Sequence, residues 1–416
     1  MKMIKFALLT TAALTAVTVS ARASELSDLK AQIEALNARM AVAEAQTAVP
    51  AGFSLIQIGR ADAIVIPSLD VDAFAPKTAH TISVVPTADM PASTVIQWSG
   101  YVRAAVTYNS VNPSGTVASA SETNIAAKYG IKVVGTTDTA VGEVGAKIAL
   151  AGNANASHAD NLTGGSNTAA TSASQYYANW NTAASVAGDG FWGWWKVTPE
   201  LTLGGGRDGS VSGNGEGFDG RANAMYAGSD ANGGYKTVGD IAQFRLSYAS
   251  GPIAAAIAVE DGHSWLGIES NFGVAGEIKY SGDTFGVELN GGMQNTGVFH
   301  AEDIWTVNAG AHIALADMFT VSAAAGMGSG VTLVDDYTKA SIWAKATLSD
   351  AMWVEAGVSH RWNTQAATTA GDVTAFGAGI YYSPVSQLTI GLEADYNVTG
   401  ASASKTNAAL LANFAF

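Results

Sequence analysis

The sequence predicts an all-β protein, a transmembrane antiparallel β-barrel of about 16 strands preceded by a short α-helical coiled coil. Two observations between residues 240 and 416 carry the barrel prediction: short segments alternate apolar and polar side chains, and every second connection between them is very short. In 388–396, the even positions are apolar and the odd positions are small or charged. A soluble β-sandwich shows the same alternation, but the unequal connections, an export signal and aromatic strand ends favour a barrel with one face on lipid.

The composition agrees with a strand-rich chain. Only 13% of the 416 residues are charged, 46 are glycine and none is cysteine. A chain with many glycine-containing turns fits these numbers better than a helical one. No run of eighteen apolar residues is present, so a membrane-spanning helix is not predicted. A closed barrel is then the remaining way to cross a bilayer.

The first 23 residues have the three parts of a secretory signal peptide. Lys2 and Lys5 precede an apolar stretch over 6–19, and Ala21-Arg22-Ala23 supplies small residues for cleavage after about Ala23. Their removal leaves 18 basic residues against 35 acidic ones, a formal charge of −17. A nucleic-acid partner is therefore not expected.

Residues 24–46 carry a heptad pattern that predicts a periplasmic coiled coil. The apolar positions are spaced by three and four residues and are Leu26, Leu29, Ile33, Leu36, Met40 and Ala43. Only about three heptads are present, so the helix would be marginal alone, and association of three copies in a trimer would stabilise it. A single amphipathic helix packed on another surface is the alternative.

Residues 47–94 contain five prolines and short apolar patches. We interpret this region as a periplasmic linker or small periplasmic segment with limited local structure. A small folded module or a barrel plug stays open as an alternative, because the patches are too apolar for a simple flexible spacer.

From residue 95 to Phe416 the chain divides into sixteen candidate strands. An even number of strands places both ends of the barrel on the periplasmic side, where the coiled coil must lie. The predicted strands are 95–108, 124–134, 142–151, 175–197 (in part), 200–207, 239–249, 252–260, 271–280, 284–293, 303–314, 318–327, 338–348, 352–362, 373–382, 387–397 and 406–416.

The connection over 208–238 follows the fifth predicted strand and is rich in glycine. A long structureless loop in a compact domain usually has a function, and here we expect it to bend inward and narrow a pore. Its acidic residues Glu216, Asp219 and Asp230 are the candidate constriction residues on the loop side.

Strand alternation assigns four basic residues, Arg103, Lys128, Lys132 and Lys147, to the lumen wall. A Lys or Arg facing lipid near the midplane costs about 2–4 kcal/mol, which favours the lumen face. Opposite the loop acids, these cations would create a transverse field that orients solutes and filters ions by charge. Alternation does not fix depth, so solvated lumen positions away from the constriction are the alternative.

Consecutive aromatic residues over Phe191-Trp192-Gly193-Trp194-Trp195 must place rings on both faces of one strand. Packing is the favoured interpretation, because aromatic area is usually structural. A subunit contact or a sugar-stacking surface is the alternative.

The sequence contains no pattern that predicts an enzyme, a cofactor or a metal site. The six histidines are widely spaced, and no G-x-S-x-G motif is present. Two glycine runs, 204–206 and 326–330, lack the lysine and helix start of a phosphate-binding loop. A hydrolase on a barrel scaffold would therefore lack a recognisable nucleophile and base.

The opening strand Trp98-Ser99-Gly100-Tyr101-Val102-Arg103, the sixteen strands, the loop after strand five and the terminal Phe416 together resemble general porins of alphaproteobacteria. The resemblance covers about 95–416. It implies a homotrimer in the outer membrane of a Gram-negative bacterium, in contact with the lipid bilayer and lipopolysaccharide. It further implies a water-filled channel in each subunit for passive diffusion of small hydrophilic solutes and ions, narrowed where loop acids face basic wall residues.

The chain departs from that family in residues 24–94. The coiled coil and the proline-containing segment are similar to those of porins with a periplasmic stalk. The alternative function is therefore a structural protein that tethers the outer membrane to the cell wall, with peptidoglycan bound through the coiled coil.

Overall fold

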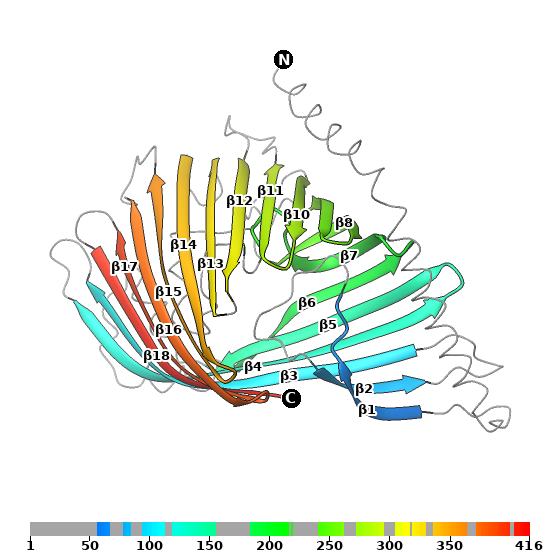
Figure 1. The fold of residues 1–416 in the computed structure, drawn as a ribbon, viewed down its shortest axis with the longest axis horizontal. Coiled ribbons are helices and arrows are strands. Elements are labelled where there is room, and N and C mark those ends of the chain that lie inside the picture. Colours follow the sequence, from blue (N-terminus) through cyan, green and yellow to red (C-terminus); the bar gives the residue numbers. More distant parts are fainter. Residues whose placement is uncertain are drawn as a thin grey trace, which may run out of the picture. The chain divides into compact units, whose positions relative to one another are not determined.

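Sixteen strands, β3 to β18, form a closed antiparallel β-barrel (Figure 1). The computed structural model describes residues 56–66, 78–84, 94–112, 119–154, 184–215, 218, 240–261, 272–294, 304–316, 318–329, 336–363, 372–399 and 403–416. The barrel strands are β3 Thr94–Asn112, β4 Ala120–Thr139, β5 Gly142–Ala154, β6 Ala184–Lys196, β7 Leu201–Gly209, β8 Asp240–Ser250, β9 Ile253–Glu260, β10 Gly273–Ser281, β11 Phe285–Gln294, β12 Ile304–Leu315, β13 Phe319–Ser329, β14 Asp336–Ser349, β15 Met352–Asn363, β16 Val373–Val385, β17 Leu388–Thr399 and β18 Ala403–Ala415.

Each barrel strand pairs with its neighbours in chain order, and the last strand closes the ring on the first. β18 pairs with β3 from Ser404 opposite Asn112 to Ala415 opposite Tyr101. The sixteen predicted strands are therefore confirmed, with ends that differ by a few residues at most places and by more at β4 and β6. The predicted coiled coil over 24–46 lies outside the described residues.

No helix among the described residues is both long and apolar enough to cross a membrane. The chain divides into two units, one of residues 1–57 with 84–93 and one of residues 58–83 with 94–416. The barrel belongs entirely to the second unit.

The predicted alternation of faces is confirmed along the strands. On β11, Glu288 and Asn290 are each 3% exposed, whereas Val287 and Leu289 are 45% and 52% exposed. Because successive side chains of a strand point to opposite faces, one face of the closed barrel is apolar and outward and the other is polar and inward.

Aromatic rings on the inward face lie over glycines of neighbouring strands. A Cβ added to Gly145 would lie 2.1 Å from the nearest atom of the Trp194 ring, and one added to Gly204 would lie 2.4 Å from the nearest atom of the Trp192 ring. Trp192 and Trp194 are buried, and Phe191 and Trp195 are exposed on the other face. The aromatic cluster over 191–195 is thus divided between the faces, as predicted, and its two inward rings pack on the wall.

Two further strands, β1 Ile56–Asp62 and β2 Thr78–Val84, lie in the region predicted as a linker with limited structure. β1 pairs with β2, and β2 pairs with β3. β18 pairs with β3 as far as Tyr101, and the backbones of Gly100 and Phe416 exchange two further hydrogen bonds, so the residues of β3 before Gly100 have a strand edge that β2 can fill. His80 of β2 stacks on Trp98 of β3 at 5.5 Å. This region is therefore partly ordered as strands that extend the barrel sheet.

We expect Gly206→Ala to destabilise the barrel more than Gly209→Ala. Gly206 has φ +141°, and a Cβ there would meet the backbone oxygen of Phe191 at 2.0 Å, whereas nothing lies within 4 Å of a Cβ at Gly209. The strained backbone alone costs about 1–3 kcal/mol, and the clash adds to it. The temperature at which the folded barrel unfolds on a heat-modifiability gel measures the difference. Equal temperatures for the two variants would contradict the expectation.

Candidate functional site in the barrel lumen

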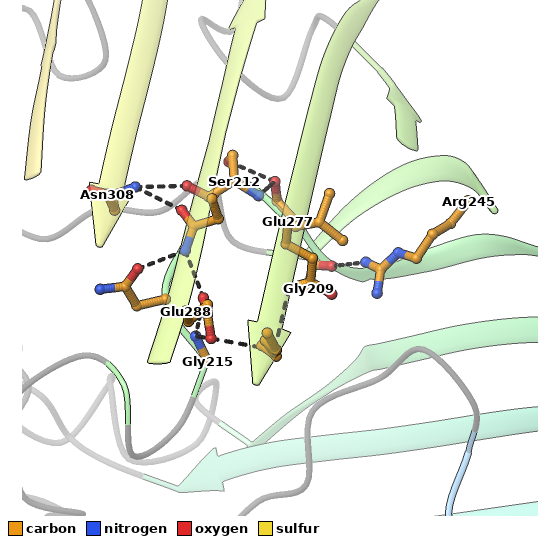
Figure 2. Close-up of polar contacts among 12 residues, drawn as sticks. Gly209, Ser212, Gly215, Arg245, Glu277, Glu288 and Asn308 are labelled. Atoms are coloured by element: carbon orange, nitrogen blue, oxygen red, sulfur yellow. Dashed lines mark hydrogen bonds and ion pairs between the residues drawn. The ribbon is translucent and has the colours of Figure 1, made fainter. Parts of the chain in front are cut away.

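The chain that follows β7 runs along the inward face of the barrel wall. Of the connection predicted over 208–238, Asp208 and Gly209 belong to β7, and residues 210–215 and Phe218 are the further described part. They contact inward side chains of β9, β11 and β12 and are called here the wall-bound loop segment. Figure 2 shows several of these contacts.

Glu260, the last residue of β9, binds the start of the wall-bound loop segment. The Ser210 hydroxyl donates to both of its carboxylate oxygens, at 2.8 and 2.9 Å, and the Val211 amide donates to Oε1 at 3.3 Å. Glu260 is 1% exposed. Hydrogen bonds to a carboxylate are stronger than neutral ones, so this contact fixes where the loop leaves β7.

Glu288 of β11 binds the loop further along. The Gly215 amide donates to Oε1 and Oε2, each at 3.1 Å, and the Asn290 amide nitrogen donates to Oε1 at 2.6 Å. Lys279 Nζ of β10 lies 3.4 Å from Glu288 Oε2 and 3.2 Å from Glu277 Oε2. The buried carboxylate is therefore held by a cation on the wall side and by backbone on the loop side.

Asparagines of adjacent wall strands hold the middle of the loop segment. Asn290 of β11 and Asn308 of β12 lie directly opposite each other in the sheet. Asn308 Nδ2 donates to the Ser212 carbonyl at 2.9 Å and to Asn290 Oδ1 at 2.9 Å, and Asn290 Nδ2 donates to Asn214 Oδ1 at 2.6 Å. Asn214 Nδ2 donates in turn to the Phe218 carbonyl at 3.0 Å. These bonds satisfy the backbone carbonyls of Ser212 and Phe218, since the described residues 210–215 and 218 belong to no strand.

Gly310 of β12 lets the loop backbone approach the wall closely. A Cβ at this position would lie 1.8 Å from the Phe218 carbonyl oxygen. The Phe218 ring packs edge-on against His312, with ring centroids 4.8 Å apart. No larger residue fits beneath the loop at Gly310.

The root of the loop is held by β5 and β8. Gln243 Nε2 donates to the carbonyls of Asp208 and Gly209, at 3.0 and 2.9 Å. Arg245 donates to the Gly209 carbonyl and lies over the Trp192 ring at 5.2 Å. The Asp208 carboxylate forms an ion pair with Lys147.

The predicted wall cations lie on the face that alternation assigned to them. Arg103 donates from Nε to Asn413 Oδ1 at 2.8 Å and lies 4.2 Å from the Tyr101 ring centroid. It is directly opposite Lys128 in the β3–β4 pair, and Lys132 is opposite the buried Ser99. Arg103 and Lys128 are therefore side by side on the inward face.

Lys147, on β5 next to β4, differs from the other three cations in its ion-pair partner rather than in its place in the ring. β3 and β11 are eight strands apart in a ring of sixteen, and so are β4 and β12. Arg103, Lys128 and Lys132 are thus on the part of the wall across from β11 and β12, which hold the wall-bound loop segment. Lys147 is instead bound to Asp208 at the root of the loop.

The predicted loop acids Glu216, Asp219 and Asp230 lie outside the described residues. The wall residues that bind the loop include Glu260, Asn290 and Asn308, which were not among the predicted site residues. The available signal was a carboxylate or amide at an inward position, but alternation places many such residues in a lumen. Within the described ranges, no cluster of three or more His, Asp or Glu side chains could hold a metal ion.

Comparisons with known proteins support the fold. No protein-family model matches the chain, and no curated protein sequence matches it. The outer membrane channel DcaP of Acinetobacter baumannii aligns with a TM-score of 0.57 and 13% identity, over 78% of this chain and 97% of that one. A structure described as "Asymmetric conductivity of engineered proteins" aligns with a TM-score of 0.51 and 17% identity, over 77% and 100%. At these identities the likeness shows the fold, a porin-type barrel.

Proposed function

We propose that the protein is an outer-membrane channel through which small hydrophilic solutes and ions diffuse passively. The observation that carries this proposal is that the described residues of the loop, 210–215 and 218, are bound to the inward face of a closed barrel. A lumen lined by Glu, Asn, Lys and Arg is wetted, so solutes cross without leaving water. The similar Acinetobacter protein is an outer membrane channel, which supports the same function.

We propose further that the narrow section of the channel has a basic side and an acidic side. Arg103, Lys128 and Lys132 form its basic side, and Glu216, Asp219 and Asp230 of the loop form its acidic side. Support comes from the ring order, which places the three cations across from the strands that bind the loop. Lys147 contributes by holding the loop root through Asp208 rather than by facing solute.

The assembly follows from the fold by analogy with porins. We propose a homotrimer in the outer membrane of a Gram-negative bacterium, with lipid and lipopolysaccharide around the apolar outer face. A tether to the cell wall through residues 24–46 stays a prediction, because that segment lies outside the described residues. We expect no catalytic activity.

Liposome swelling tests the channel function. Liposomes with the purified, folded barrel should swell in solutions of small neutral sugars, and the rate should fall steeply as the sugar grows. Liposomes prepared with heat-unfolded protein are the control. Rates that equal this control for the smallest sugar would reject the proposal.

We expect Lys128→Glu to shift the ion preference of the channel toward cations. Lys128 lies beside Arg103 on the inward wall, so the exchange changes the local charge by two units at the proposed basic side. The reversal potential in a tenfold salt gradient measures the shift, which should shrink at high ionic strength because salt screens the field. Lys405→Glu is the matched control nearer the loop end of β18. Equal shifts of the reversal potential in the two variants would mean that the wall around Lys128 is not the ion-selective section of the channel.

A further inference from the structure

Residues 62–66, which precede the barrel in the chain, lie against its inner wall. Gln97 of β3, 5% exposed, binds this segment at two backbone positions. The Ile64 amide donates to Gln97 Oε1 at 2.6 Å, and Gln97 Nε2 donates to the Asp62 carbonyl at 2.8 Å. One side-chain amide thus replaces a strand partner for this stretch of backbone.

The wall residues beneath the segment face inward and lie directly opposite one another on successive strands. Gln97 is directly opposite Val134, Val134 is opposite Lys147, and Lys147 is opposite Trp192. These wall residues belong to four adjacent strands, β3 to β6. All four side chains share the face that carries the other lumen residues.

Apolar contacts hold the far end of the segment on these wall residues. Ile66 is buried in a cluster with Val134, Trp192 and Trp194, and Ile64 packs against the same cluster. Val65, between them, is 71% exposed. Since its two neighbours face the wall, Val65 points away from the wall and into the lumen.

We propose that residues 62–66 form a second pore-lining element, and that Val65 is a residue past which solutes travel. The segment covers the wall of β3 to β6, whereas the wall-bound loop segment covers β9, β11 and β12, so the two elements narrow the lumen from separate parts of its circumference. The inference rests on the proposed channel function and adds a contribution of the chain before the barrel to the size of the pore. It also agrees with the plug alternative for 47–94.

Single cysteines test the placement, because the full-length chain contains none of its own. In planar bilayers, a negatively charged methanethiosulfonate reagent added to Val65→Cys should reduce the current, and a thiol reductant should restore it. Val141→Cys is the matched control, since Val141 is 65% exposed in the β4–β5 turn. It should be labelled without a change in current. Complete labelling of Val65→Cys with unchanged current would overturn the proposal.

A second readout does not depend on conduction and separates the two proposals. In the folded protein, Ile66→Cys should react with the reagent more slowly than Val65→Cys, and adding Gln97→Ala should bring the two rates together. If wild-type protein does not conduct, the channel function fails, but these rates still report where the segment lies. Equal rates at positions 65 and 66 with Gln97 intact would show that the segment is not bound to the wall.

Discussion

Glu288→Ala is expected to raise the single-channel conductance and to make the current noisier. The exchange removes the acceptor of the Gly215 amide and the partner of Asn290 and Lys279. A buried donor left unsatisfied costs about 1–3 kcal/mol, which shifts the ratio of docked to undocked loop by a factor of about 5 to 150. A loop that leaves the wall part of the time gives current fluctuations that the native channel lacks.

Glu355→Ala is the matched control for the loss of a buried inward carboxylate. Glu355 of β15 is 5% exposed, lies 3.9 Å from Lys345 and accepts from Trp353 Nε1 at 3.0 Å. Lys345 and Trp353 both belong to the wall, so this variant should lose stability without the added current noise. Identical noise in the two variants would mean that docking of the loop through Glu288 does not set the conductance.

Gly310→Ala is expected to displace the loop from the wall without changing any charge. The added Cβ would lie 1.8 Å from the Phe218 carbonyl oxygen and 3.0 Å from Asn214 Nδ2. Because the obstructing atom belongs to backbone, the loop must move as a unit, and overpacking of this kind costs typically about 1–3 kcal/mol. The conductance and the largest sugar admitted to liposomes should both change, with ion preference altered less than in Lys128→Glu.

Gly135→Ala controls for a glycine replacement within a barrel strand. The nearest atom to a Cβ at Gly135 is the Val95 carbonyl oxygen, at 4.0 Å. This variant should conduct as the native protein does. A Gly310→Ala channel with native conductance and native size limit would contradict the placement of Phe218 over β12.

The barrel could be predicted from the sequence because its determinants are local. Alternation along each strand and short turns such as the one between β8 and β9 are set by neighbouring residues. Alternation placed Arg103, Lys128 and Lys132 on the inward face. The binding of the loop could not be predicted. Ser212 and Asn308, for example, are 96 residues apart, and nothing in an isolated asparagine indicates which carbonyl it will bind.

The segment before the barrel was predicted less well for the same physical reason. Its prolines indicate a linker, but Gln97 and the cluster around Trp192 supply partners that local sequence does not contain. For Lys147, alternation predicted that the side chain faces inward but not what it binds. Its role depends on the ion pair with Asp208. The opposing acids Glu216, Asp219 and Asp230 stay predictions.

Single-channel recording of the refolded full-length protein in planar bilayers is the most direct test that the barrel encloses a water-filled, loop-narrowed channel. We predict discrete conductance steps. Neutral polymers should reduce the current only when they are small enough to enter the channel, and the largest polymer that does so should be larger for Gly310→Ala. Steps in groups of three would add support for the trimer. A heat-modifiable, strand-rich protein that gives no conductance steps would contradict the channel.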